Sequence, residues 1–289
     1  MFDRLFLYNH FGAGDVFESR EFAREWVDIV QPKESYYAHG KHPRILLDMP
    51  FLKYTEVTPI MYGMSPYVID GTDLYVNTWI GRDGSYVLPG IGCVVEEIYR
   101  MHNDILKSLG LPQLSKEIAQ YIPNIDHLWY NIDGIKSFVA ENKQDKVLIS
   151  NGPVQSCQAE NFDFSPIIYK LAGRFPEKQF IITTNIPHDG YDNLIYTGDI
   201  IKQPDFDLNE ISYLSRFCST IVGRNSGPHV FSQVYDNWMD ETKKIVSFTY
   251  TAVASTFVLN REIKARKYWS PSTDTETVFS QIESVLNAV

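Results

Sequence analysis

The residues best suited to chemistry in this sequence lie in loops that follow short apolar segments. One such loop, GRNSGPHVFSQ at residues 223–233, opens a predicted helix. Gly227 lets a ligand approach the backbone, and the free N–H groups at a helix start attract negative charge. Ser226 can donate its hydroxyl, and Arg224 can form a charge-assisted hydrogen bond with a phosphate. A simpler interpretation makes Asn225 or Ser226 an N-cap and Gly227 a turn residue.

A second polar loop, SNGPVQSCQAEN, follows an apolar segment near the middle of the chain. It offers the neutral hydrogen-bond donors Asn151, Gly152, Ser156 and Gln158. The first loop of the chain, NHFGAGD, carries the titratable pair His10 and Asp15. Asp15 also stands where a helix N-cap belongs, and Glu18 three residues later completes the pattern of a capping box.

Two further patterns resemble metal sites. The DFD sequence at 205–207 has the spacing of a metal-binding DxD, but it precedes a predicted helix, so Asp207 is better interpreted as a cap. His39 and His42 have no carboxylate at ligand spacing, which argues against a zinc site. We therefore expect no metal.

Taken as one block, DLNEISYLSRFCSTIVGRNSGPH at 207–229 resembles the donor-binding segment of the heptosyltransferase-like glycosyltransferases. In that group a Ser/Thr-Gly-Pro-x-His motif lies beside the donor diphosphate. Ser226, Gly227 and Pro228 match the motif, while His229 arrives one residue early, and by itself a histidine here can be a packed helix residue. The resemblance also places Glu210 near the donor ribose.

A second segment of this chain, GAGDVFESREFAREWV at 12–27, is similar to the first loop of the same group. The resemblance implies that Asp15 faces the acceptor and serves as general base, with His10 as the alternative. It further implies that the loop containing Asn151, Gly152 and Ser156 meets the donor phosphates. The basic residue usual in that loop is missing, so charge neutralisation would fall to Arg224 or helix dipoles, with Lys202 a distant candidate.

Short apolar runs alternate with helical periodicity along the chain, which indicates parallel sheets with helices on both faces. In the N-terminal half the patterns predict strands at 4–8 and 36–38, a hairpin around Gly71, and helices from Asp15, over 42–47 and over 94–109. In the C-terminal half they predict strands at 146–150, 179–184, 194–196, 220–223 and 244–248, and helices over 165–175, 208–217, 228–235 and 275–286. With the resemblance, this implies an α/β protein of the GT-B type. Two Rossmann-like domains would face a cleft, the acceptor domain at 1–140 and the nucleotide-sugar domain at 141–289.

Bulk properties narrow the class of partner. The net charge of −10, with no long run of Lys or Arg, argues against nucleic acid and anionic membranes. Three widely spaced cysteines favour a reducing compartment, and no segment predicts a signal peptide or a transmembrane helix, so we expect a cytoplasmic protein.

The resulting hypothesis is a metal-independent, inverting glycosyltransferase. It would use a nucleotide sugar as substrate rather than a cofactor, and a glycan or other hydroxyl acceptor. The alternatives are an epimerase or hydrolase acting on the nucleotide sugar, and a binding module without catalysis.

Overall fold

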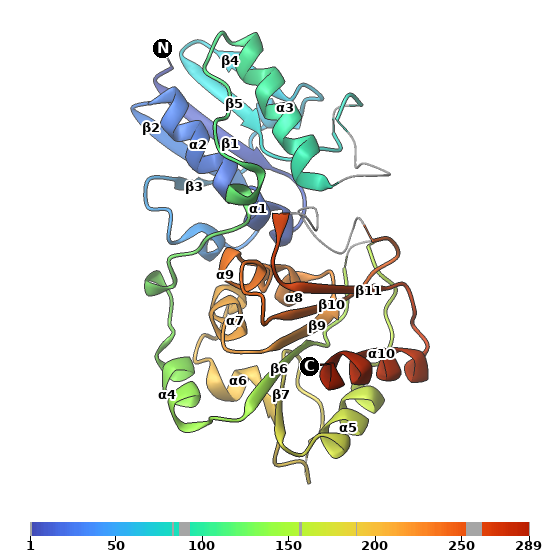
Figure 1. The fold of residues 1–289 in the computed structure, drawn as a ribbon. Coiled ribbons are helices and arrows are strands. Elements are labelled where there is room, and N and C mark those ends of the chain that lie inside the picture. Colours follow the sequence, from blue (N-terminus) through green and yellow to red (C-terminus); the bar gives the residue numbers. More distant parts are fainter. Residues whose placement is uncertain are drawn as a thin grey trace. The chain divides into compact units, whose positions relative to one another are not determined.

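The fold comes from a computed structural model that describes residues 2–82, 84–86, 93–155, 158–188, 190–252 and 262–288 (Figure 1). These residues form two compact units, one reaching from the N-terminus to Ile125 and one from Asp126 to the C-terminal helix. Each unit is built around its own β-sheet.

The first unit holds a five-stranded sheet in the order β3-β2-β1-β5-β4. All neighbouring strands are parallel except β4 and β5, which form the hairpin predicted around Gly71. Its elements are β1 (Arg4–Asn9), α1 (Ala13–Glu18), α2 (Arg20–Val30), β2 (Glu34–His39), the 3-10 helix η1 (Pro43–Leu46), β3 (Lys53–Thr55), η2 (Pro59–Tyr62), β4 (Tyr67–Asp70), β5 (Asp73–Asn77), α3 (Val94–Ser108) and η3 (Ile118–Tyr121).

Alternation along β1 gives this sheet two different faces. Leu5 and Leu7 are fully buried in the core of the unit. On the opposite face Phe6 stacks between Tyr36 of β2 and Tyr75 of β5, with ring centroids 4.7 Å apart on both sides. These cross-strand aromatic pairs lie at directly opposed register positions, where such side chains stabilise a sheet most.

The second unit holds a six-stranded parallel sheet in the order β11-β10-β9-β6-β7-β8. Counted from β6, this is the strand order 3-2-1-4-5-6 of dinucleotide-binding folds, with the order reversing between β6 and β9. Its elements are η4 (His127–Trp129), α4 (Asp133–Glu141), β6 (Asp145–Ser150), α5 (Ser165–Arg174), β7 (Lys178–Ile182), β8 (Leu194–Tyr196), α6 (Thr197–Ile200), α7 (Leu208–Ser215), β9 (Thr220–Arg224), α8 (Gly227–Phe231), α9 (Tyr235–Trp238), β10 (Lys244–Phe248), β11 (Arg266–Ser270) and α10 (Thr275–Asn287).

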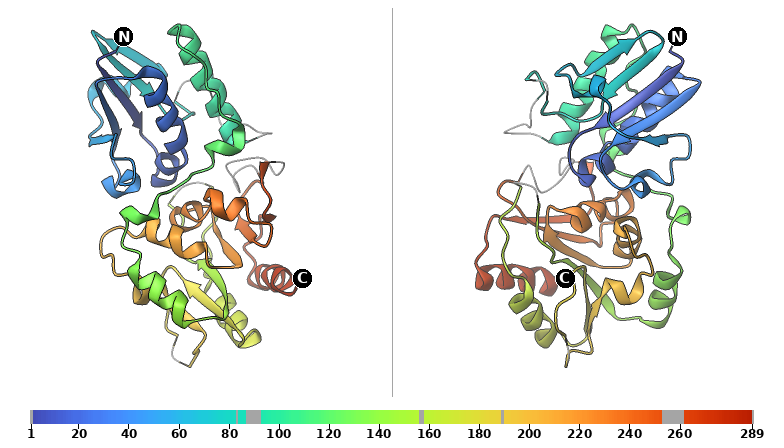
Figure 2. Two further views of the ribbon diagram at one scale, coloured as in Figure 1. Left: turned by 60° about the vertical axis from the view of Figure 1, so that its left-hand side comes forward. Right: turned by 180° about the vertical axis from the view of Figure 1, so that it is seen from behind.

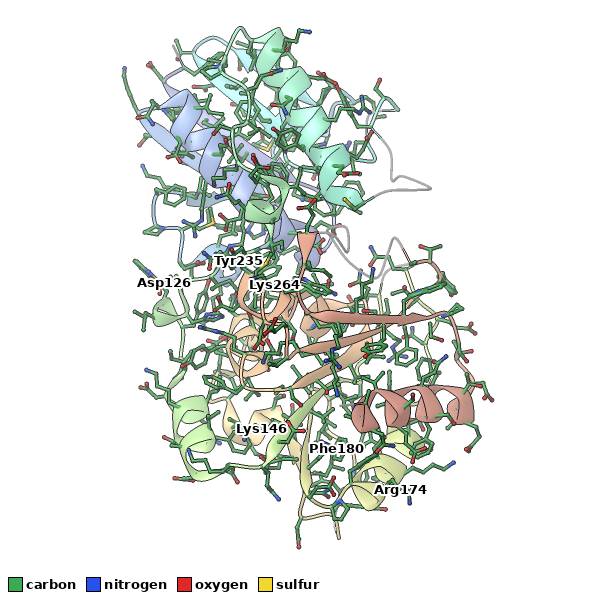
Figure 3. The ribbon with its side chains drawn as sticks, in the orientation of Figure 1. Asp126, Lys146, Arg174, Phe180, Tyr235 and Lys264 are labelled. Carbon is green, nitrogen blue, oxygen red and sulfur yellow. The ribbon has the colours of Figure 1, made fainter. Side chains whose placement is uncertain are left out.

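Helices cover both faces of the second sheet (Figure 2). Val147 and Ile149 of β6 pack in a cluster with α5 and α10, whereas Leu148 packs with α4, α6 and α7 on the other side. Phe180 of β7 lies inside the former cluster, while Arg174, at the end of α5, reaches the surface (Figure 3). The uninterrupted apolar runs of these strands follow from burial on both faces.

Two adjacent lysines at the start of β10, Lys243 just before the strand and Lys244 as its first residue, each hold the end of a helix on one face of the sheet. The Lys243 ammonium donates to the carbonyls of Arg216 and Cys218, both at 2.6 Å, just beyond the end of α7. The Lys244 ammonium donates to the carbonyls of Val285, at 3.1 Å, and Ala288 at the end of α10. Cations there satisfy free carbonyls and complement the negative end of the helix dipole.

The first predicted helix differs from expectation. It begins at Ala13 rather than Asp15 and is divided at Ser19 into α1 and α2. Ser19 donates its hydroxyl to the carbonyl of Val16 at 3.0 Å, a local bond that competes with regular helix. The helix predicted over 228–235 is shorter in the structure, where α8 ends at Phe231 and a separate helix, α9, begins at Tyr235.

The division between the units falls at Ile125, before the boundary expected near residue 140. The connecting segment is held to the first unit by two buried carboxylates of α2. Glu25 accepts the N–H of Ser115 at 2.7 Å, and Glu21 accepts the N–H of Asn124 at 3.2 Å. Helix α4, which the sequence patterns did not predict, buries Ile135 in the second unit.

Candidate functional site

The loop after β1 positions Asp15 at the third residue of α1. Its Oδ2 accepts the N–H of Gly12, the N-cap residue, at 2.7 Å. A Cβ on Gly12 would lie only 2.8 Å from that oxygen, so glycine is what lets the carboxylate approach the backbone. Asp15 therefore caps the helix start from inside it, and the expected N-cap position was wrong.

Burial raises the pKa of Asp15 to about 6, although the N–H of Gly12 and the charge of Lys41 act in the opposite direction. Loss of water disfavours the charged carboxylate more than these partners favour it. A carboxylate with this pKa is mostly ionised at neutral pH and still basic enough to accept a proton.

Glu18 lies one turn after Asp15 on α1. Burial, and secondarily the charge of Asp15, raises its pKa well above the ordinary value. The capping box expected between Asp15 and Glu18 is therefore replaced by two desolvated acids on one helical turn. A raised pKa depends on burial that a sequence does not reveal, so the spacing alone could not identify this pair.

His10 lies in the same loop, with its Nε2 2.7 Å from the carbonyl of Met61. The carbonyl can only accept, so Nε2 carries the proton and Nδ1 is the basic nitrogen of the neutral ring. Burial lowers the pKa of His10, and the ring lies 5.1 Å from that of Tyr62. Arg82, which sequence patterns did not single out, donates to the carbonyl of Tyr62 at 2.7 Å.

In the second unit, the loops after β6 and β9 meet at the point where the strand order reverses. Ligands of open parallel sheets bind beyond the strand ends at such a point. Asn225, Ser226, Gly227 and Pro228 are each partly exposed there, directly after the buried strand β9. The backbone of this segment is thus accessible.

Ser226 and Gly227 begin α8. Ser226 is the N-cap in extended conformation, and its side chain makes no capping hydrogen bond. A Cβ on Gly227 would lie 3.3 Å from Cδ1 of Leu208, the first residue of α7. Gly227 therefore allows close packing of the start of α8 against α7.

Arg224 has other partners than the expected phosphate. Its guanidinium, on a residue 1% exposed, donates to the carbonyl of Phe162 at 2.9 Å. It also donates to the carbonyls of Asn151, at 3.2 Å, and Gly152. Its Cζ lies 5.0 Å from the ring centroid of Phe162 and 5.1 Å from that of Phe164. Arg224 thereby fastens the loop after β6 to the end of β9.

The loop after β6 is also fastened to β7. Oδ1 of Asn151 accepts the N–H groups of Thr183 and Thr184, and Nδ2 donates to the carbonyl of Thr184 at 2.8 Å. A Cβ on Gly152 would lie 2.8 Å from Oγ1 of Thr184. Ser156, also expected in this site, lies outside the described residues.

His229 is fully buried on α8, with Nε2 2.9 Å from Oγ of Ser247. Burial lowers its pKa to about 3, so the ring is neutral. A Cβ on Gly223 would lie 2.9 Å from Nδ1 of His229 and 2.7 Å from Cβ of Ser150. The ring thus packs over glycine at the end of β9, in line with the packed-residue interpretation.

Glu210 is fully buried on α7 and accepts the N–H of Asn131 at 3.2 Å. Asn225 accepts from Nε2 of Gln233 at 3.3 Å, which links the loop to the end of α8. Lys202 is exposed and donates to the carbonyl of Asp199 at 2.7 Å. Their donor-binding roles stay predictions.

The two patterns that resembled metal sites occupy structural positions. Asp207 is the N-cap residue of α7 by position, although its side chain makes no capping hydrogen bond, and burial raises its pKa. His42 is the N-cap of η1 and accepts the N–H of Arg44 at 3.2 Å, and His39 accepts the N–H of Lys41 at 3.2 Å. Within the described part of the chain, no three His, Cys, Asp or Glu side chains are grouped so as to hold a metal ion.

Solved structures of glycosyltransferases resemble this chain. A glycosyl transferase family 9 protein of Veillonella parvula matches with a TM-score of 0.56 and 11% identity, over 99% of this chain and 90% of that one. The ADP-heptose LPS heptosyltransferase II of E. coli matches with a TM-score of 0.57 and 13% identity, over 98% of each chain. The iron-containing, dodecameric heptosyltransferase TibC in complex with ADP-D-beta-D-heptose matches with a TM-score of 0.53 and 11% identity, over 99% of this chain and 76% of that one.

No protein-family model and no curated protein matches the sequence. Among the described helices, none combines the length and apolar character that crossing a bilayer requires. At identities of 9–13%, the likeness to the solved structures concerns the fold alone. In fold, this chain resembles the heptosyltransferase-like glycosyltransferases, as its motifs predicted.

Proposed function

We propose that this protein is a glycosyltransferase that moves a sugar from a nucleotide-sugar donor to an acceptor hydroxyl. The observation that carries the proposal is Asp15, a carboxyl whose pKa of about 6 suits a general base, in the loop after β1. The first unit would hold the acceptor and the second unit the donor, as the resemblance implies. The fold of the matched heptosyltransferases supports this assignment.

The reaction proposed is a single displacement. The Asp15 carboxylate takes the proton of the acceptor hydroxyl as its oxygen attacks the anomeric carbon. The bond from that carbon to the diphosphate breaks, and the nucleoside diphosphate leaves with the electron pair. Attack opposite the leaving group inverts the anomeric centre. His10 is the second candidate base, acting through Nδ1 because Nε2 is engaged with Met61.

For the donor, we propose that the diphosphate lies over Ser226 and Gly227. The first N–H groups of α8 have no acceptor within that helix and are suited to an anion. Arg224 would act indirectly, by holding the carbonyls of Asn151 and Gly152 and so fixing the neighbouring loop. TibC, solved with ADP-D-beta-D-heptose, makes a purine nucleoside diphosphate sugar the first donor to test.

We propose further that transfer needs no metal, because DFD serves as the start of α7 and neutral N–H groups remain to meet the diphosphate. TibC contains iron, so the point needs direct measurement. Transfer should continue unchanged in EDTA. Loss of transfer on chelation, with recovery on adding Mn²⁺ or Mg²⁺, would return Asp205 and Asp207 to the site.

A donor-consumption assay distinguishes the proposal from its alternatives. The protein is incubated with each of a panel of nucleotide sugars, with and without an oligosaccharide mixture, and released nucleoside diphosphate is measured. A transferase releases diphosphate faster when acceptor is present. Equal release without acceptor would indicate a hydrolase, conversion of the sugar without release would indicate an epimerase, and binding without turnover would indicate a binding module.

A further inference from the structure

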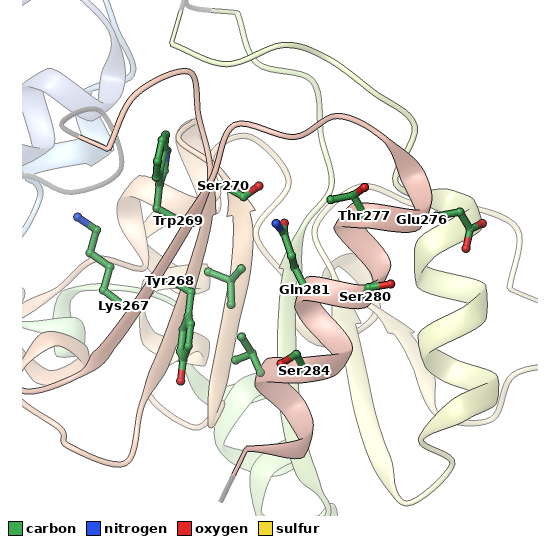
Figure 4. A pocket seen from close by; sticks show the side chains of 11 residues that line it. Lys267, Tyr268, Trp269, Ser270, Glu276, Thr277, Ser280, Gln281 and Ser284 are labelled. Carbon is green, nitrogen blue, oxygen red and sulfur yellow. The ribbon is translucent and has the colours of Figure 1, made fainter.

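One hollow in the second unit lies away from the loops of the proposed donor site. It is a groove of about 760 Å³ between the edge strand β11 and helix α10 (Figure 4). Strands β9 and β10 separate β11 from β6, so the groove does not adjoin the point where the strand order reverses. Its volume falls within the range of pockets that bind small ligands.

The groove has an apolar floor and a polar rim. Val246 of β10, Tyr268 of β11 and Val285 of α10 provide apolar surface, and the two valines belong to the core cluster on this face. Ser280, Gln281 and Ser284, at neighbouring positions on α10, add two hydroxyls and an amide. An occupant that fits must therefore be apolar on one side and carry hydroxyl or amide groups at its edges.

Gln281 gives the groove a specific requirement. Its Oε1 is buried and has no hydrogen-bond partner among the described residues. Figure 4 shows the side chain extending from α10 toward β11, into the groove. A buried polar atom without a partner costs free energy, and a ligand O–H or N–H group would remove that cost.

The charges around the groove do not favour an anion. Glu276 lines its end near the start of α10 and is paired with Lys170 of α5. That carboxylate would repel a phosphate, and the rest of the α10 wall offers uncharged hydroxyl and amide groups. Lys267 of β11 also lines the groove, but its side chain extends away from α10 (Figure 4). The groove is thus suited to a neutral ligand.

We propose that the groove between β11 and α10 is a carbohydrate-binding site, separate from the donor site. A pyranose has an apolar face of C–H groups that can pack against the Tyr268 ring and the two valines. Its hydroxyls lie at the rim of the ring, where one donates to Oε1 of Gln281 and others meet Ser280 and Ser284. The site would hold a saccharide without reacting with it.

The proposal is tested by NMR titration of the full chain with maltotetraose and, separately, with chitotetraose. The side-chain amide of Gln281, assigned through its absence in Gln281→Leu, should shift with at least one of these sugars. Gln281→Leu should bind that sugar about 2- to 10-fold more weakly, as expected for loss of one neutral hydrogen bond. Asn287→Leu is the matched control, since it replaces an exposed amide on the same helix outside the groove and should bind normally.

Tyr268→Ala should abolish the shift while the thermal melt stays cooperative, and if this variant fails to fold, Gln281→Leu remains decisive. The proposal is overturned if neither sugar shifts the Gln281 amide. It is equally overturned if Gln281→Leu binds as tightly as Asn287→Leu, or if the shifts map to the loops after β6 and β9. Because these sugars carry no nucleotide, the result is independent of the transferase assay.

Discussion

The loop after β1 and the loops after β6 and β9 occupy equivalent places in their sheets and are built in opposite ways. The former carries two acids, Asp15 and Glu18, whose pKa values are raised by burial. The loops after β6 and β9 carry polar side chains that form hydrogen bonds within the protein, as Arg224 and Asn151 do. Desolvated acids suit proton transfer, whereas loops tied together by side-chain hydrogen bonds suit presentation of a rigid backbone.

The two regions also differ in how the burial of a charged side chain affects the stability of the folded state. Holding a carboxylate out of water destabilises the folded state, and a site retains such a group where its reactivity is used. Arg224, by contrast, compensates its own burial with three carbonyl acceptors and two aromatic rings. The chemistry should accordingly depend on single atoms in the first unit and on loop shape in the second.

The largest effect is expected from Asp15→Asn. The amide can still accept the N–H of Gly12 but cannot take a proton, so transfer should fall by about 10²–10⁴-fold. Initial rates at saturating donor measure the change, and unaltered donor affinity is the control. Near wild-type transfer by Asp15→Asn would make His10 the base and remove the contrast between the two regions.

Arg224→Ala should lower the free energy of unfolding by about 3 kcal/mol, because three carbonyls lose a buried charged donor. Donor affinity should fall with it, as the loop after β6 loosens. Chemical denaturation and donor titration of the same variant distinguish a structural role of Arg224 from direct contact with the diphosphate. Weaker donor binding at unchanged stability would show instead that Arg224 contacts the diphosphate directly.

A smaller effect is expected on the free energy of unfolding of Asp15→Asn, which should rise, whereas that of Arg224→Ala falls. The pKa of Asp15 is about 6 in the folded protein against 3.8 as the ordinary value, so the folded state binds this proton more tightly. Wild-type stability therefore falls as pH rises from about 4 to 6, and the full cost is present above pH 6. Asp15→Asn lacks this cost and should be more stable than wild type at pH 8, by at most about 3 kcal/mol.

Denaturant unfolding at pH 8 and pH 4.5 measures this difference, which should shrink at the lower pH. The substitution also removes the charge of Asp15 that helps to raise the pKa of Glu18, and this relief acts in the same direction, toward greater stability at pH 8. If Asp15→Asn is less stable than wild type at pH 8, the carboxylate is held there by favourable contacts, and the first unit is no more strained than the second.

Much of the fold could be predicted from the sequence because buried positions recur regularly along strands and helices and are occupied by apolar residues. Strands β8 and β10 were predicted with their observed bounds, and the cores of β6 and β9 were located by their apolar runs. Strands β3 and β11 were missed because most of their side chains are exposed or partly exposed. Such segments lack the alternation or continuous apolarity on which the prediction depends.

The candidate site was located less completely. The loops were found because strand ends mark ligand sites in parallel sheets. The partners of their side chains were not, because Arg224 and His229 are engaged by residues distant in sequence, Phe162 and Ser247. Glu18 was interpreted as part of a cap, and Arg82 and Lys41 were not noticed, since nothing in their spacing reveals proximity to His10 or Asp15.

The central claim, a nucleotide sugar bound at the strand reversal of the second sheet, is tested most directly by thermal shift. Wild type, Gly227→Val and Asp15→Asn are melted with a panel of nucleoside diphosphates and their sugars. A true donor at about 100 times its dissociation constant should stabilise wild type and Asp15→Asn by about 2.7 kcal/mol. It should leave Gly227→Val unstabilised, because the added side chain would press against Leu208 and shift the backbone N–H groups that begin α8. No stabilisation of wild type by any nucleotide, or equal stabilisation of Gly227→Val, would contradict the account.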